Sequence, residues 1–135
     1  MGAGVMPPFG MSKFESILED FSNALKRFEE ILSEDETDIV RDSAIKRFEL
    51  VFDLAWKTIK AFLEERHNIP CVSPRNCLRE AFRVGLISYD DYWITLADDR
   101  NYTVHAYSEA LADKIYKDLP RALEFFKQLS TALQK

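Results

Sequence analysis

The chain has 135 residues and a formal net charge of -5, with 30% charged and 47% hydrophobic residues. This composition is typical of a single globular domain with a real hydrophobic core, and it excludes a disordered chain. The acidic balance disfavours broad, charge-driven coating of nucleic acid, but it does not exclude a small local basic site. No apolar run approaches the roughly 20 residues that a membrane-spanning helix needs.

The N-terminal stretch MGAGVMPPFG lacks the basic start of a signal peptide. We therefore expect residues 1–11 to be a disordered leader, either native or a cloning remnant, and residues 12–135 to form one helical domain in the cytoplasm. Without an export signal, Cys71 and Cys77 are expected to be reduced thiols and not a disulfide. The two cysteines and two scattered histidines give no zinc-ligand spacing, so no metal site is predicted.

Two long helices are predicted in the first half of the chain. Ser12 and Glu15 form a capping box, and apolar residues then recur at three- and four-residue spacing as far as residue 33. The second helix is predicted over about residues 38–66, with an apolar stripe of the same kind. Two apolar helices of this length joined by a short loop should pack antiparallel.

Charged residues surround the apolar stripe of the second helix. They are Arg41, Asp42, Lys46, Arg47, Glu49, Asp53 and Lys57. Two interpretations stay open. Either these residues form a solvated face with pairs three or four residues apart, or Arg47 and Glu49 face a partner protein or a second copy of this chain.

A third helix is predicted to begin at Pro74, with Ser73 as its N-cap and Gly85 as its C-terminal cap. A fourth helix is predicted to open in residues 88–91 and to run to about residue 100. We then expect the helix to break over residues 101–104, where an asparagine precedes two β-branched residues that are weak helix formers.

The fifth helix is predicted from about Ser108, and Pro120 should kink or divide it. No stretch alternates with period two for long enough to be a convincing strand. The sequence therefore predicts an all-α fold, an up-and-down antiparallel bundle of four to five helices.

The segment DDRNYTVHAY, residues 98–107, holds the candidate functional residues and one of the two histidines of the protein. On an ideal helix, Arg100 and His105 would lie roughly 140° apart, and His105 and Tyr107 roughly 160° apart. These three side chains cannot share one helical face. A pocket that uses all of them needs a turn in this segment, or a second chain that supplies the missing groups.

Arginine and histidine together can cleave RNA without a metal ion. A neutral imidazole can take the proton of a 2′-hydroxyl, an imidazolium can protonate the leaving oxygen, and a guanidinium can stabilise the charge on the phosphate. Two chains related by a two-fold axis would supply two of each group, so a nuclease of this kind is expected to be a homodimer. The alternative is structural: Arg100 pairs with a nearby acid, His105 starts a helix and Tyr107 packs.

A family resemblance favours the chemical interpretation. The run Arg100–Tyr107, in which four residues separate Arg from His and one separates His from Tyr, resembles the motif of HEPN-domain toxins of the HepT type. The second-helix runs RDSAIKRFE (41–49) and LAWK (54–57) resemble the subgroup called nucleotidyltransferase substrate-binding proteins. Pro74-Arg75, EAF (80–82) and GLI (85–87) are similar to that subgroup too. The resemblance spans about residues 14–133.

The resemblance implies a dimeric helical bundle that partners a minimal nucleotidyltransferase (MNT) in a toxin–antitoxin module. Arg100 and His105 would be the catalytic residues of a metal-independent ribonuclease that needs no cofactor, and Asn101 would shape the turn or hold the phosphate. The partner would use ATP to transfer AMP onto Tyr107, and the added charge would block the cleft and repel RNA. The alternative from the same family is a non-catalytic subunit whose dimer cleft binds a nucleotide or substrate. If Asp98 or Asp99 pairs with Arg100, the site is partly masked.

Overall fold

The computed structural model describes residues 10–105 and 108–135, and they form an all-α fold, as predicted. The helices are α1 (Lys13–Leu32), α2 (Asp38–His67), α3 (Pro74–Arg83), α4 (Tyr92–His105) and α5 (Glu109–Leu133). The expected leader falls almost wholly on residues 1–9, which lie outside the described residues, and it stays a prediction.

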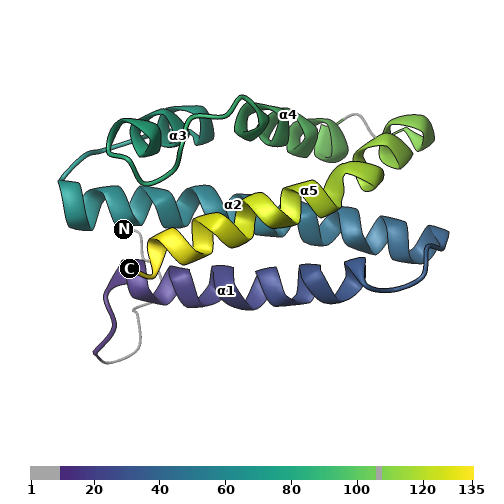
Figure 1. The fold of residues 1–135 in the computed structure, drawn as a ribbon, viewed down its shortest axis with the longest axis horizontal. Coiled ribbons are helices and arrows are strands. Elements are labelled where there is room, and N and C mark those ends of the chain that lie inside the picture. The colour runs from purple at the N-terminus through teal and green to yellow at the C-terminus, as the bar shows by residue number, and fades with distance from the viewer. Residues whose placement is uncertain (1–9, 106–107) are drawn as a thin grey trace.

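Helix α2 is the centre of the bundle. It lies antiparallel to α1, while α5 crosses both of them and α3 and α4 follow one another along another side of α2 (Figure 1). Among the described residues, α2 contacts each of the four other helices. One helix therefore takes part in both the α1–α5 side and the α3–α4 side of the molecule.

The predicted helix starts are confirmed. Ser12 accepts a hydrogen bond from the backbone N–H of Glu15, whose side chain accepts one from the backbone N–H of Ser12, which completes the capping box. Ser73 caps α3 ahead of Pro74, and Ser108 caps α5 through the backbone N–H of Leu111. These side chains satisfy donors that the first turn of a helix leaves free.

The predicted helix ends are also confirmed for α2 and α3. Asn68 ends α2 in the left-handed region, with φ of 54°, and Gly85 follows α3 with φ of 78°. Asparagine and glycine are the residues that adopt this conformation at the least cost.

Helix α4 does not break where the sequence predicted. It continues through residues 101–104 to His105 because packing outweighs the weak helix propensity of this stretch. Thr103 is buried, and its hydroxyl donates a hydrogen bond to the backbone oxygen of Arg100. Pro120 likewise does not divide α5, which is continuous from Glu109 to Leu133, although the helix bends along its length (Figure 1).

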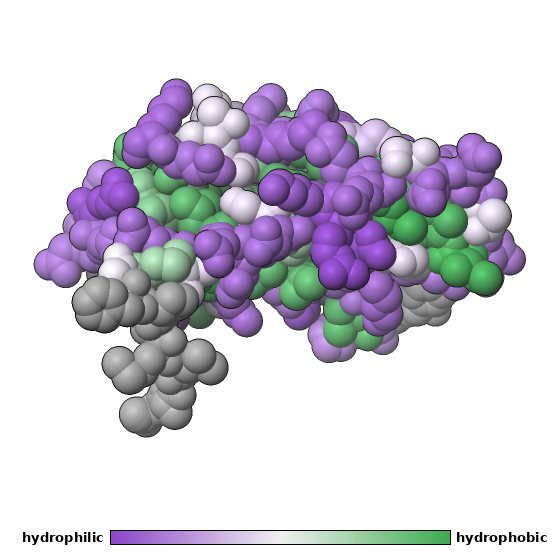
Figure 2. Space-filling view, turned by 90° about the horizontal axis from the view of Figure 1, so that it is seen from below, coloured by the Kyte–Doolittle hydropathy of each residue, from purple (hydrophilic) through white to green (hydrophobic). Residues whose placement is uncertain are grey.

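Aromatic rings fill the core between α1, α2 and α5. Phe126 is fully buried, and its ring lies 6.3–6.5 Å, centroid to centroid, from the rings of Phe21, Phe28 and Phe48. The ring of Trp93 brings α4 to the same cluster, at 6.0 Å. On the face viewed in Figure 2, hydrophilic side chains predominate and hydrophobic ones gather in separate areas. The amphipathic pattern read from the sequence thus builds this core.

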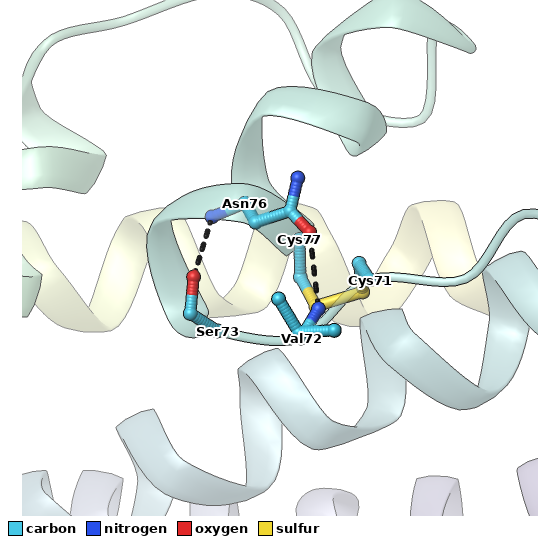
Figure 3. Close-up of a disulfide and its surroundings, with 5 residues drawn as sticks. All are labelled: Cys71, Val72, Ser73, Asn76 and Cys77. Carbon is cyan, nitrogen blue, oxygen red and sulfur yellow. Dashed lines mark hydrogen bonds between the residues drawn. A yellow bond between two sulfur atoms is a disulfide. The ribbon is translucent and has the colours of Figure 1, made fainter.

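The expectation of two free thiols is wrong, because Cys71 and Cys77 form a disulfide (Figure 3). Both cysteines are buried, and the turn into α3 brings their Cα atoms to 5.2 Å. That turn is held by Ser73, which caps the backbone N–H of Asn76, and by Asn76, whose side chain accepts from the N–H of Val72. The pairing follows from this local turn, whereas the prediction relied on the cellular compartment alone.

In the part of the chain that the structure describes, no helix combines the length and the apolar character needed to cross a membrane.

Candidate functional site

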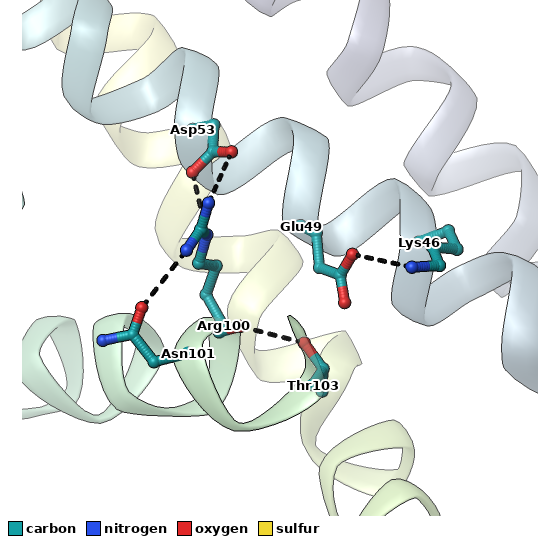
Figure 4. A network of polar contacts seen from close by, with 6 residues as sticks. All are labelled: Lys46, Glu49, Asp53, Arg100, Asn101 and Thr103. Carbon is teal, nitrogen blue, oxygen red and sulfur yellow. Dashed lines mark hydrogen bonds and ion pairs between the residues drawn. The ribbon is translucent and has the colours of Figure 1, made fainter. Parts of the chain in front are cut away.

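Arg100 is held in place by a carboxylate from another helix. Its Nε and Nη2 atoms donate hydrogen bonds to the two carboxylate oxygens of Asp53 on α2, both at 3.1 Å (Figure 4). Its Nη1 atom donates to the side-chain oxygen of Asn101 at 3.3 Å. This bidentate geometry fixes the orientation of the guanidinium, because both hydrogen bonds to Asp53 must align at once.

The Arg100 guanidinium stays accessible despite these bonds. The side chain is 27% exposed and that of Asp53 is 31% exposed. A guanidinium has five N–H donors, and the three bonds above use three of them. Within the part of the chain that the structure describes, two donors are therefore left to bind an anion, and Asp53 positions the group that carries them.

A cavity of about 410 Å³ opens beside this ion pair, between α2, the start of α3 and α4. We call it the α2–α3–α4 cavity. Its lining includes Asp53, Trp56, Lys57, Arg75, Arg100 and Asn101. The lining has three cationic side chains and one carboxylate, so the cavity is positively charged within a protein of net charge -5.

The acidic pair before Arg100 does not mask it. Asp98 forms an ion pair with Arg75 of α3, and Asp99 lines a second cavity of about 670 Å³ between α4 and α5. The suggested masking by Asp98 or Asp99 is therefore wrong. The acid that pairs with Arg100 is Asp53, because it faces α4 from the neighbouring helix.

The second cavity contains a carboxyl group with a shifted pKa. Burial, together with the nearby carboxylates of Asp118 and Asp98, raises the pKa of Asp99 to about 6, against the opposing charge of Lys114. Burial and a hydrogen bond to the Asp118 carboxylate also raise the pKa of Tyr92 well above its ordinary value. Ionising these groups costs free energy, because burial and like charge both disfavour the anion.

The two second-helix residues considered for a partner-facing role have partners within the protomer. Glu49 is largely buried and points towards α4 (Figure 4). Its Oε1 atom accepts from Lys46 at 3.4 Å, and its buried Oε2 atom has no hydrogen-bond partner among the described residues. Arg47 donates to the backbone oxygen of Arg27 on α1 at 2.7 Å. Their role at a partner or dimer surface stays a prediction.

His105 lies apart from the cavity. It is the last residue of α4, its side chain is exposed, and it is not among the residues that line the cavity beside Arg100. Arg100 and His105 therefore sit five residues apart on one continuous helix, about 140° apart around its axis. Tyr107 falls outside the described residues. One protomer does not bring Arg100 and His105 together in this cavity.

Residues 16–135 match the family model described as nucleotidyltransferase substrate binding protein like. The chain belongs to this family. A Haemophilus influenzae protein named probable ribonuclease HepT is 34% identical over 89 residues, which are 60% of this chain. The aligned part spans 61% of that relative.

Two solved structures share the fold of this nucleotidyltransferase substrate-binding family member. A Thermus thermophilus protein is 34% identical with a TM-score of 0.78, covering 85% of this chain and 99% of its own. A Haemophilus influenzae protein, described as revealing the fold of a substrate-binding domain of a nucleotidyltransferase, is 25% identical with a TM-score of 0.76. That match covers 87% of this chain and 99% of the other.

The residues of α2 that lie beside Arg100 in this family member were not predicted from the sequence. The sequence pattern assigns Asp53 and Lys57 to a solvated face of the second helix and gives no sign of a cavity there. One signal was available: Glu49, Asp53 and Lys57 recur every four residues and so share one face of α2. Within the described residues, no group of three or more His, Cys, Asp or Glu side chains could hold a metal ion.

Proposed function

We propose that this protein is a metal-independent endoribonuclease toxin that acts as a homodimer and is silenced by a partner nucleotidyltransferase. Arg100 would bind the scissile phosphate, and His105 would transfer the protons. The observation that supports this most directly is the guanidinium of Arg100. Asp53 fixes its orientation, and two of its N–H donors have no partner among the described residues. A phosphate in the transition state is the ligand that suits such a group.

A second copy of the chain would complete the site. His105 is too far around α4 to meet a phosphate bound by Arg100 of the same helix within the cavity. The C-terminal part of α4 exposes two large hydrophobic side chains, Tyr102 at 52% and Val104 at 40%. Apolar side chains at such a position favour contact with another protein surface. The proposal is that α4 packs against α4 of the second copy, which brings two arginines and two histidines to one cleft.

The reaction would follow general acid–base chemistry. The neutral imidazole of one His105 removes the proton of the RNA 2′-hydroxyl as this oxygen forms a bond to phosphorus. The bond from phosphorus to the 5′-oxygen of the next nucleotide breaks, and the imidazolium of the second copy protonates that oxygen. The products are a 2′,3′-cyclic phosphate and a free 5′-hydroxyl. Arg100 stabilises the added negative charge on the phosphoryl oxygens throughout.

Silencing would use Tyr107 as an acceptor for AMP. The tyrosine oxygen attacks the α-phosphate of ATP in the partner's active site, pyrophosphate leaves and the phenolic proton goes to solvent. The attached nucleotide brings negative charge and bulk close to His105. RNA phosphate would then be repelled from the cleft. Asn101, already bonded to Arg100, helps to position the arginine.

Cleavage of a single-stranded RNA in the presence of EDTA tests the catalytic assignment. We expect Arg100→Ala and His105→Ala each to lower the cleavage rate by about 100-fold or more, the range typical of charge stabilisation and acid–base groups. The matched controls are Arg79→Ala, an exposed arginine of α3 outside the cavity lining, and His67→Ala, the other histidine. Cleavage at the unmodified rate in both catalytic variants would overturn the assignment.

Intact mass after co-expression with a partner nucleotidyltransferase tests the silencing step. Tyr107→Phe should keep ribonuclease activity and gain no AMP. Tyr102→Phe, which changes an exposed tyrosine five residues earlier, should gain AMP like the unmodified chain. Transfer of AMP onto the Tyr107→Phe chain would show that another residue is the acceptor.

A second function is favoured by one observation: the cavity beside Arg100 does not include His105. A non-catalytic subunit that binds a nucleotide or substrate for its partner nucleotidyltransferase needs only the anion-binding half of the site. A stable complex with the partner, combined with no cleavage of any RNA by the chain free of AMP, would favour this function.

A further inference from the structure

We propose that the α2–α3–α4 cavity is a binding subsite for one nucleotide, with the base against Trp56 and the phosphate between Lys57 and Arg75. The proposal deepens the proposed function by assigning the neighbouring nucleotide of the RNA to this cavity. Binding itself, however, does not depend on cleavage. Three features of the cavity carry it: its charge, its aromatic wall and its size.

The charge of the lining favours a phosphate. Lys57 is exposed at the cavity, and among the described residues no carboxylate lies within ion-pair distance of it. Arg75 is 54% exposed on the α3 side and pairs with one carboxylate, Asp98. The two side chains approach the cavity from different helices. An anion placed between them would gain hydrogen bonds from both, and no carboxylate of the described residues would compete with it for Lys57.

The aromatic wall favours a base. Trp56 is half-buried, one residue before Lys57, and it lines the cavity. An indole ring offers a flat face on which any nucleobase can stack, and such stacking is tolerant of base identity. The other tryptophan, Trp93, is buried in the core with 3% exposure and does not line this cavity.

The size and position of the cavity fit one nucleotide. Its volume of about 410 Å³ lies at the lower end of the range of about 300–1,000 Å³ for small-molecule sites. Arg100 borders the cavity, so a nucleotide in it could be joined through the RNA backbone to the phosphate that Arg100 binds. The same chemistry would suit a nucleotide unit of single-stranded RNA or a free nucleotide.

Titration with defined ligands tests the proposal on the full chain. AMP, adenosine and ribose 5-phosphate are added while tryptophan fluorescence is followed. We expect AMP to quench the Trp56 signal saturably, because its base stacks on the ring. Adenosine and ribose 5-phosphate should each bind about ten-fold or more weakly, because each keeps only one half of the contacts.

Variants of the cavity separate its two halves. Lys57→Ala and Arg75→Ala should each weaken AMP binding about ten-fold and leave adenosine binding unchanged. The controls are Lys26→Ala, an exposed lysine of α1, and Arg79→Ala, one turn after Arg75 on α3, neither of which lines the cavity. Trp56→Phe, followed by calorimetry, should weaken AMP and adenosine alike.

Two titrations, one with an oligoribonucleotide and one with AMP, identify the source of the nucleotide. They also distinguish failure of the subsite from failure of the catalytic assignment. A six-residue oligoribonucleotide is titrated into the His105→Ala chain, which binds without cleaving. Tighter binding of the oligonucleotide than of AMP assigns the cavity to RNA, and tighter binding of AMP assigns it to a free nucleotide. Absence of saturable quenching by either ligand, or equal AMP affinity of the Lys57→Ala and Lys26→Ala chains, overturns the subsite. Cleavage that persists in His105→Ala instead overturns the catalytic assignment alone.

Discussion

The two sides of α2 differ in what holds them. On one side, Phe48 and other apolar residues pack into the core with α1 and α5, with almost no exposed surface. On the other side, Asp53 bonds to Arg100 of α4 beside a cavity that Lys57 of α2 and Arg75 of α3 also line. Burial of apolar surface supplies most of the folding free energy, whereas partly exposed ion pairs supply little. The apolar side should therefore set stability, and the polar side should be freer to serve binding.

The largest expected effect is on the apolar side. Phe126→Ala removes the ring that contacts Phe21, Phe28 and Phe48, and it should lower the free energy of unfolding by about 3–5 kcal/mol. Urea denaturation measures this loss. Leu50→Ala, at a position 54% exposed, is the control and should change stability by less than about 0.5 kcal/mol. If both changes lowered the free energy of unfolding equally, the apolar core would not be what sets stability.

Next comes the disulfide at the edge of the polar side. Because Cys71 and Cys77 close a short loop, replacing both by alanine should lower the free energy of unfolding by about 2 kcal/mol. The denaturation midpoint of the unmodified chain should fall on adding a reductant, and that of the double variant should not respond. If the denaturation midpoint of the unmodified chain did not change on adding the reductant, the disulfide would be absent in solution.

The pH dependence of stability should reveal Asp99. Its pKa is raised from its ordinary value of 3.8 to about 6 on folding, so between about pH 4 and 6 the folded chain binds more protons than the unfolded one. Its contribution therefore makes the protein less stable as the pH rises through this window. For a partly buried group the effect is about 1 kcal/mol after allowing for solvent screening.

Asp99→Asn checks this contribution. The variant should be more stable than the unmodified chain at pH 7, and the difference should shrink towards pH 4, as measured by urea denaturation at each pH. A constant difference across the window would show that Asp99 does not titrate in it.

The smallest expected effect on stability comes from the pair that orients Arg100. Asp53→Asn should cost at most about 1 kcal/mol, because both side chains are partly exposed. The rate of RNA cleavage should nevertheless fall about ten-fold, because the guanidinium loses its fixed orientation. Measuring both quantities on one preparation separates positioning from folding. A stability loss as large as that of Phe126→Ala would mean that the polar side also carries the fold.

The apolar side was largely predictable from sequence, and the polar side was not. Helix caps such as Ser12 and Ser73 act through neighbours three residues away, so local spacing reveals them. The apolar stripes needed only periodicity. By contrast, the Asp53–Arg100 pair joins residues 47 positions apart, and no local pattern specifies which acid meets which arginine.

The two local errors have physical causes of the same kind. The predicted break at residues 101–104 rested on propensities of a few tenths of a kcal/mol, and burial of Thr103 outweighs them. The disulfide depends on the turn that Ser73 and Asn76 build, and the cellular compartment says nothing about that turn.

Helix α2 sets a constraint on how this chain can change. Its 30 residues form one uninterrupted rod of about 45 Å, in which the core residue Phe52 is followed directly by Asp53. Inserting or deleting a single residue before this point would rotate everything beyond it by about 100° relative to the rest. Carboxylates would turn towards the phenylalanine cluster, and apolar groups would turn towards the cavity. The fold can tolerate single substitutions along α2, but a change in the length of this helix would disrupt the core and the site together.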